Sequence, residues 1–172
     1  MLIVRDATQE DAEALAAIYG DACLHGFGTF EEEAPPAEEM ARRLAEVKAG
    51  GLPYLVAEAE GAVVGLSYAK PFRPRAAYRY TVEDSIYIAP SAQGTGVGRA
   101  LLTELIRRCE ALGLRQMTAV IGDSGNAGSI GLHARHGFLR NGTLRSVGFK
   151  FGRWVDSVLM QRPLGTGDAT KP

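Results

Sequence analysis

The sequence predicts one mixed α/β domain, in which a central, mostly antiparallel sheet carries helices on its faces. Apolar residues recur at helical spacing in four segments, and seven other segments have the alternation or β-rich composition of strands. The two kinds of segment follow in the order β-α-α-β-β-β-α-β-α-β-β. Hairpins dominate the middle of this order, and helices alternate with strands after it. The order therefore favours a mixed sheet over a fully parallel, doubly wound one.

The first half of the chain is read from its helix and turn signals. Thr8, with Asp11 three residues later, resembles a capping box that opens a helix. Pro35-Pro36 precedes a second helix, which Gly50-Gly51 end. A hairpin turn is expected at Glu60-Gly61 between two β-rich runs. The expected elements are a strand at 2–5, a helix at 8–23, a helix between Pro36 and Gly50, and strands at 53–60 and 62–70.

The second half begins with an alternating run, which Pro90 ends and which we read as a central strand. A glycine-rich loop then opens an amphipathic helix that Gly113 ends, and Gly137 ends the last helix. The expected elements are a strand at 78–89, a helix at 100–112, a strand at 116–121, a helix at 126–136, and strands at 138–147 and 153–161. We expect one domain over residues 1–164 and a flexible C-terminal tail over residues 165–172.

Composition narrows the classes of function. A chain of 172 residues buries enough surface to fold without disulfides or a structural metal. A net charge of -1 argues against a broad nucleic-acid-binding surface. No apolar run is long enough to span a membrane, and no secretory signal is seen. Cys23 and Cys109 are far apart in the sequence, so we expect reduced thiols and a cytoplasmic protein.

The sharpest local signal is the loop Gln93-Gly94-Thr95-Gly96-Val97-Gly98-Arg99, between a strand and a helix. Glycines let backbone N–H groups approach a ligand, and a helix N-terminus adds unpaired donors, so a phosphate or pyrophosphate fits here. A P-loop requires Gly-Lys-Ser/Thr, which Arg99-Ala100 does not supply. A dinucleotide fingerprint requires a third glycine at position 99. The pyrophosphate of coenzyme A remains as a third interpretation, beside a merely glycine-rich turn.

Gln93-x-x-Gly96-x-Gly98, between a strand and a helix, resembles the acetyl-CoA motif of the GNAT N-acetyltransferases. Four further stretches resemble the phosphinothricin and methionine sulfoximine (methionine sulfone) acetyltransferases: Arg75 to Tyr78, Tyr80 to Glu83, Leu132-His133 and Gly148 to Asp156. The resemblance implies the GNAT fold with its splayed sheet, and acetyl-CoA bound beside the loop and the main chain of Ile86, Tyr87 and Ile88. It also implies a homodimer.

Acetyl transfer to an amine needs a group that accepts a proton, because a free α-amine is mostly protonated at pH 7. Glu83 is our candidate general base. Alternation places it with Thr81, Ser85 and Tyr87 on one face of the strand, opposite Asp84 and Ile86. The family's acidic residue in its Thr-Val-Glu segment matches Glu83. The alternative is a solvated carboxylate at a strand edge.

Asn126, Ser129 and His133 fall on one face of the last helix and form a polar stripe that could face the cofactor. The resemblance implies that Asn126 contacts coenzyme A and that His133 is the family's histidine of the Leu-His element. Many GNAT enzymes carry a tyrosine acid on this helix and this chain does not, so the proton donor stays open. The alternative for His133 is a hydrogen-bonded structural histidine. His133 and His136 lack a third ligand, so no metal is expected.

The acceptor pocket is expected from two loops. Arg73 and Arg75 can clamp a carboxylate by paired hydrogen bonds, and Arg75 and Tyr78 match the family's Arg-x-Ala-Tyr. Phe27 and Thr29 could close over an aliphatic side chain, or they could anchor their loop in the core.

The expected function is acetyl-CoA-dependent N-acetylation of the α-amine of a small amino acid or analogue, of the methionine sulfoximine, methionine sulfone or phosphinothricin type. Three alternatives stay open: another small amine as acceptor, a protein N-terminus as acceptor, or a non-catalytic acyl-CoA-binding regulator. No nucleic-acid or membrane partner is expected.

Overall fold

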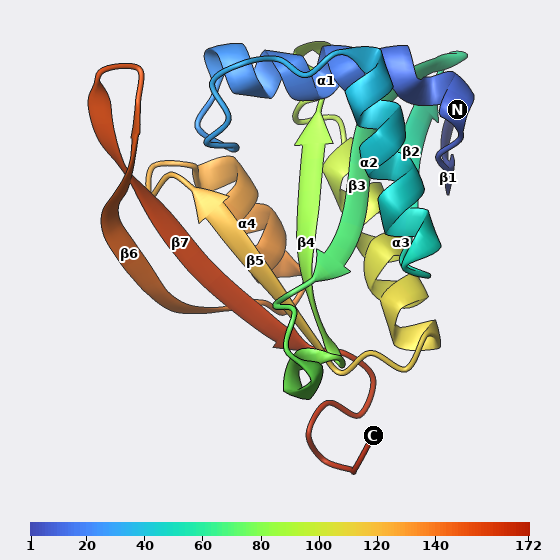
Figure 1. The fold of residues 1–172 in the computed structure, drawn as a ribbon, viewed down its shortest axis with the longest axis vertical. Coiled ribbons are helices and arrows are strands. Elements are labelled where there is room, and N and C mark those ends of the chain that lie inside the picture. Colours follow the sequence, from blue (N-terminus) through green and yellow to red (C-terminus); the bar gives the residue numbers. More distant parts are fainter.

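A computed structural model describes all residues from 1 to 172 and contains one seven-stranded sheet. The strands lie in the order β1-β2-β3-β4-β5-β7-β6, and only the β4–β5 pair is parallel (Figure 1). The strands are β1 (Leu2–Asp6), β2 (Tyr54–Ala59), β3 (Ala62–Pro71), β4 (Thr81–Ile88), β5 (Gln116–Gly122), β6 (Leu139–Lys150) and β7 (Arg153–Pro163). The helices are α1 (Ala12–His25), α2 (Ala37–Ala49), α3 (Val97–Ala111) and α4 (Ala127–Arg135). The mixed, mostly antiparallel sheet predicted from the sequence is confirmed.

The two parallel strands separate part-way along their length. Their pairing runs from Thr81 opposite Gln116 to Asp84 opposite Ala119 and ends there, although β4 continues to Ile88 and β5 to Gly122. Beyond that point each strand keeps only its outer partner, β3 for β4 and β7 for β5. Figure 1 shows the two strands diverging like the arms of a V. One edge of β4 from Ser85 to Ile88 is therefore left without a neighbouring strand.

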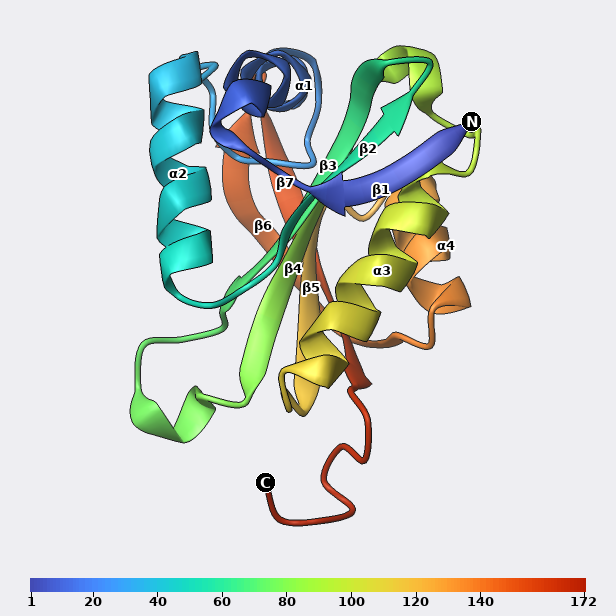
Figure 2. The same ribbon diagram turned by 90° about the vertical axis from the view of Figure 1, so that its right-hand side faces the viewer.

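Helices cover both faces of the sheet, with α1 and α2 on one side and α3 and α4 on the other (Figure 2). The core on the α3 side has 19 buried residues, including Leu101, Leu105 and Met117. The core on the α1–α2 side has 10, including Leu15 and Leu44. Two hydrophobic layers therefore hold the sheet between them, and polar groups that reach its centre are exceptions to be explained.

Several element boundaries differ from the expected ones. The central strand starts at Thr81 rather than 78, because residues Ala76–Tyr78 form a 3₁₀ turn. The first helix is preceded by a 3₁₀ turn at Gln9–Asp11, where Thr8 and Asp11 form the expected capping box. The last helix begins at Ala127, and the final hairpin strands extend to Lys150 and Pro163. Arg115 hydrogen-bonds to Thr166, Thr170 and two backbone carbonyls of the tail, whose expected flexibility stays a prediction.

Candidate active site

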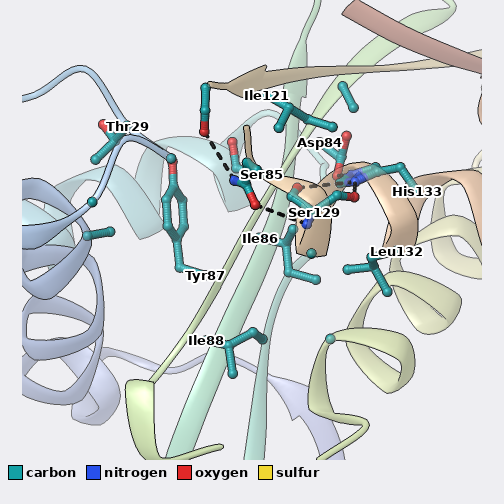
Figure 3. Close-up of a pocket in the computed structure, with 18 of the residues that line it drawn as sticks. Thr29, Asp84, Ser85, Ile86, Tyr87, Ile88, Ile121, Ser129, Leu132 and His133 are labelled. Atoms are coloured by element: carbon teal, nitrogen blue, oxygen red, sulfur yellow. Dashed lines mark hydrogen bonds and ion pairs between the residues drawn. The ribbon is translucent and has the colours of Figure 1, made fainter. Parts of the chain in front are cut away.

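A cleft of about 1700 Å³ passes through the opening between β4 and β5. On one side of the sheet it is bounded by α1 and the loop after it, and on the other by the N-terminal half of α3 and by α4. Figure 3 shows Tyr87 and Thr29 on one side of β4, and Asp84, Ser129 and His133 on the other. Ligand groups on the two faces of the sheet can therefore meet inside one cavity.

The glycine loop forms one end of this cleft. The backbone N–H groups of Gly96, Val97, Gly98 and Arg99 have no acceptor in the protein, and no side chain caps this helix end. Gly96 has φ +95, a left-handed conformation that favours glycine. Four free donors together with the positive end of the helix dipole suit a pyrophosphate. The unpaired N–H groups that the sequence predicted are present, and the binding of a pyrophosphate by them stays a prediction.

The residues of the loop do not all face the cleft. Gln93, Gly94, Gly96, Gly98 and Arg99 line it. Val97 is instead buried in the core on the α3 side, so only its backbone is available to a ligand. The hydroxyl of Thr95 donates to the carbonyl oxygen of Ala92 at 2.6 Å and closes the preceding turn.

The free edge of β4 forms the floor of the opening. Ile86 and Ile88 pack against the core on the α3 side, so their side chains anchor the strand from that face. Tyr87 points the opposite way and meets the ring of Tyr19 edge-on at 4.8 Å between ring centroids. Because the main chain of Ser85–Ile88 lacks a partner on the β5 side, it can pair with an extended ligand as an added strand would.

The polar stripe predicted on the last helix is present, but its members have separate roles in the structure. The side chain of Asn126 caps α4: its Oδ1 accepts from the N–H of Ser129 at 3.1 Å, and its Nδ2 donates to the carbonyl of Gly122 at 3.1 Å. His133 is 2% exposed, and its Nε2 lies 2.9 Å from Oδ2 of Asp84. Ser129 and Asn126 line the cleft beside it. Asp84 was not expected in the site.

Glu83 projects from β4 toward the α1–α2 side, as the alternation predicted, and lines the cleft. Its Oε1 lies 3.1 Å from Nζ of Lys70, its register partner on β3. The Glu83 side chain is 20% exposed, so the carboxylate is neither fully solvated nor sealed in the core. The position is consistent with either a proton acceptor or a binding group for a cationic amine.

The loop after α1 closes the cleft on that side. Phe27 and Thr29 both line the cleft, and the hydroxyl oxygens of Thr29 and Tyr19 lie 2.9 Å apart. A Cβ at Gly122 would clash with the carbonyl oxygen of Phe27, so only glycine permits this approach of loop and sheet. Lys150, 1% exposed, donates to the carbonyls of Gly26 and Thr29 at 2.7 and 2.8 Å. The loop is thus held against β5 and β6.

Arg73, Arg75 and Tyr78 lie on the exposed loop between β3 and β4 and are not among the residues that line the cleft of the single chain. Tyr78 packs edge-on against Phe72, and the guanidinium of Arg73 lies over the same Phe72 ring. Their predicted part in binding a carboxylate stays a prediction.

Three polar residues in or beside the site were not singled out by the sequence analysis: Asp84 and Lys70, which line the cleft, and Lys150, which holds the loop beside it. Strand alternation put Asp84 on the core-facing side, and a carboxylate among apolar neighbours is the feature that could have marked it.

No three His, Cys, Asp or Glu side chains come together as a metal site would require. None of the four helices is long and apolar enough to cross a bilayer.

Comparison with known proteins shows the family to which the chain belongs. Residues 4–159 match the model of the acetyltransferase (GNAT) domain. The chain is 56% identical over 169 residues to a phosphinothricin N-acetyltransferase of Alcaligenes faecalis, covering 98% of this chain and 86% of that protein. It is 42% identical over 162 residues to an L-methionine sulfoximine/L-methionine sulfone acetyltransferase of Pseudomonas aeruginosa, covering 92% of each.

The crystal structure of a phosphinothricin acetyltransferase from Sinorhizobium meliloti, in complex with AcCoA, superposes with a TM-score of 0.96. It has 50% sequence identity, and the match covers 99% of this chain and 92% of that one. The chain therefore belongs to the GNAT acetyltransferase family, and the prediction of an N-acetyltransferase with the GNAT fold is confirmed.

Proposed function

We propose that this protein transfers the acetyl group of acetyl-CoA to the α-amine of a small amino acid or analogue. The acceptor class is methionine sulfoximine, methionine sulfone or phosphinothricin, as in the relatives named above. The observation that carries the proposal is the position of Glu83. Its carboxylate lines the same cleft as the four free N–H groups of α3, but on the opposite face of the sheet.

The residues of the cleft fit acetyl-CoA. The free N–H groups at the start of α3 would hold the pyrophosphate, and the unpaired main chain of Ser85–Ile88 would hold the extended arm. Acetyl-CoA would supply the acetyl group as an activated thioester. Gly94, Gly96 and Gly98 are the positions at which a side chain would obstruct this approach.

Glu83 acts in this proposal as the general base, directly or through an ordered water. It takes the proton from the acceptor's ammonium group, so that the amine can attack. Nζ of Lys70 lies beside the carboxylate, and Phe27 and Thr29 border the space left for the acceptor's side chain. The acceptor's carboxylate would be bound by Arg73, Arg75 and Tyr78. His133 would take part in catalysis from the side of the cleft that holds the cofactor.

The proposal includes a homodimer. Large apolar side chains are exposed on the hairpin of β6 and β7, which ends the sheet and projects from the rest of the fold (Figure 1). They are Leu139, Leu144, Val147, Phe149, Phe151 and Trp154. Monomers rarely expose so many large apolar groups on one element. Phe151 also meets the ring of Phe27 edge-on at 5.4 Å, so a second copy on this hairpin would lie close to the acceptor loop.

A substrate panel tests the function. The purified protein and acetyl-CoA are mixed with methionine sulfoximine, methionine sulfone, phosphinothricin, proteinogenic amino acids, a polyamine and a peptide with a free N-terminus, and release of the coenzyme A thiol is followed. We expect turnover with the free amino-acid analogues and little with their α-amides. Preference for the peptide or polyamine would overturn the acceptor class. Binding of acetyl-CoA without turnover of any amine would favour a regulator.

A cytoplasmic location stays a prediction from the sequence.

A further inference from the structure

The hydrogen bonds of His133 occupy both nitrogens of its ring. Nδ1 lies 2.7 Å from the carbonyl oxygen of Ser129, one turn earlier on α4, and Nε2 lies 2.9 Å from Oδ2 of Asp84 on β4 (Figure 3). The His133 and Asp84 side chains are 2% and 1% exposed. The pair therefore connects the last helix to the centre of the sheet in a place that water does not reach.

The two hydrogen-bond partners of His133 determine which of its ring nitrogens carry a proton. A carbonyl oxygen only accepts, so Nδ1 of His133 carries a proton. When Asp84 is ionised its Oδ2 also only accepts, so Nε2 carries a second proton. An imidazole with both nitrogens protonated has no lone pair left to act as a base. The pair is then an imidazolium and a carboxylate, and its net charge is zero, which suits its burial.

Two further side chains around the pair, Phe138 and Cys109, are neutral and do not form an ion pair with Asp84 or His133. Phe138 meets the His133 ring edge-on at 5.0 Å between centroids and fixes its plane. Cys109 on α3 is the other titratable side chain close to Asp84. Burial, followed by the negative charge of Asp84, raises the pKa of Cys109 to about 12, so it stays a neutral thiol. Oδ1 of Asp84 is buried without a hydrogen-bond partner, so His133 is the principal partner of this carboxylate.

We propose that Asp84 is a positioning residue that holds His133 as a fixed imidazolium, and so makes His133 a proton donor toward the cofactor side of the cleft rather than a base. The part that concerns the reaction rests on the proposed function. Nδ1 also lies 3.4 Å from Oγ of Ser129, whose residue lines the cleft. A proton can pass from Nδ1 to this hydroxyl while the hydroxyl gives its own proton to an anionic leaving group. The pair then holds one proton fewer, as neutral imidazole with Nε2–H on the Asp84 carboxylate and an unprotonated Nδ1 opposite the Ser129 carbonyl. Because that carbonyl only accepts, this state is unfavourable, and Nδ1 takes up a proton again to restore the imidazolium.

The balance of effects on the pKa of His133 supports this assignment. Burial alone lowers the pKa, but the hydrogen bond and charge of Asp84, with the Ser129 carbonyl, outweigh it and raise the pKa above the ordinary value of 6.5. Removal of the Asp84 charge leaves burial as the main effect. The pKa of His133 should then fall below the ordinary value, because the hydrogen bond to the Ser129 carbonyl is the smallest of these effects and does not offset the lost hydration.

NMR of the imidazole rings in the protein without ligands tests the proposal independently of activity. The chain has three histidines, and the signals of His133 are identified by their loss in His133→Gln. In the wild type at pH 7 we expect both ring nitrogens of His133 to have the shifts of protonated nitrogen. In Asp84→Asn we expect His133 to titrate at lower pH and to become a neutral Nδ1–H tautomer. Asp156→Asn, which removes a carboxylate that binds Ser124 and Ser146 instead, should leave the His133 titration unchanged.

A neutral His133 in the wild type at pH 7 would overturn the proposal, even if Asp84→Asn failed to fold. An unchanged titration in a folded Asp84→Asn would do so as well. With a working substrate, kcat of Asp84→Asn should fall by about a hundredfold at pH 8, the lower end of what a positioned acid contributes. The loss should be smaller at pH 6, with KM for acetyl-CoA within about twofold of wild type. An equal loss at every pH would indicate a merely structural role. Absence of acetylation in the wild type would reject the proposed function and leave the NMR result valid.

Discussion

Lys150, near the end of the sixth strand, donates a 2.8 Å hydrogen bond from its buried ammonium to the carbonyl oxygen of Thr29, 121 residues earlier in the chain. Its other hydrogen bonds go to the carbonyls of Gly26 at 2.7 Å and Ala22 at 3.5 Å. No carboxylate hydrogen-bonds to this ammonium, and burial lowers the pKa of Lys150. The charge therefore holds the backbone of the loop after α1, and this loop lines the cleft.

We predict that Lys150→Met loosens this loop. The free energy of unfolding should fall by about 2 kcal/mol, because carbonyls that accepted from a charged donor lose their partner. KM for the acceptor should rise severalfold, while KM for acetyl-CoA stays near the wild-type value. Denaturant unfolding and steady-state kinetics measure both. Lys48→Met is the matched control, since Lys48 donates to one carbonyl, that of Ala7, away from the cleft. An unaltered acceptor KM in Lys150→Met would show that the loop does not shape the acceptor site.

Glu83→Gln should lower kcat near neutral pH by about a hundred- to ten-thousandfold, because it keeps the size of the side chain and removes the proton acceptor. Affinity for acetyl-CoA should barely change, since Glu83 lies on the face of β4 opposite the start of α3, on the side that the proposed function gives to the acceptor. The deficit should shrink as the pH rises, because more of the amine is already deprotonated. Rate profiles from pH 6 to pH 10 measure this. A deficit of constant size would indicate that Glu83 positions the amine. Near-normal turnover would remove it from the mechanism.

Gly96→Ala should raise KM for acetyl-CoA by tenfold or more, because a Cβ beside the free N–H groups obstructs the pyrophosphate. The left-handed φ at this position adds a cost of about 1–2 kcal/mol in stability. Gly113→Ala separates the two effects: Gly113 has φ +76 with open surroundings, at the other end of α3. Both variants should lose similar stability, and only Gly96→Ala should lose affinity. Equal KM values in the two variants would reject the loop as the cofactor site.

Arg75→Ala should raise KM for the acceptor by about ten- to a hundredfold if a charge-assisted bond to the carboxylate is lost, a change worth about 1.5–3 kcal/mol. Acetyl-CoA affinity should not change, and discrimination against the α-amide of the acceptor should weaken. Arg79→Ala is the control, because the Arg79 guanidinium lies over Tyr80 and donates to the carbonyl of Ala76 on the same loop. A wild-type enzyme that accepts the amide as well as the acid has no carboxylate clamp.

Trp154→Glu should convert a dimer to a monomer. Trp154 is 66% exposed and meets Phe149 edge-on across the hairpin, so a charge there would be buried in the proposed interface. Sedimentation of the two proteins at equal concentration measures the change. Leu112→Glu, at an apolar position of similar exposure after α3, should leave the assembly as it is. A wild-type monomer at micromolar concentration would refute the dimer.

Local patterns in the sequence were enough to predict the sheet, its helices and the glycine-rich loop that opens α3. Gly96 and Gly98 before a helix indicate an anion site because loop and helix end are contiguous in the chain. Strand alternation likewise placed Glu83 and Asp84 on opposite faces, because the side-chain period of a strand is a local property. Boundaries were predicted less accurately where a turn adjoins a strand: Tyr78, read as the first residue of the central strand, is the last residue of the 3₁₀ turn Ala76–Tyr78, and the strand starts at Thr81.

Only the tertiary structure decided which distant residues meet. The pairing of β4 with β5 ends at Asp84 and Ala119, and beyond that point each strand keeps only its outer partner, β3 or β7. The contacts of Asp84 with His133 and of Lys150 with Thr29 span 49 and 121 residues. In each contact, a charged group is buried where two elements meet, and the packing of those elements brings its partner within hydrogen-bonding distance. The sequence alone therefore determined which chemical groups are available, and the fold determined which of them act together.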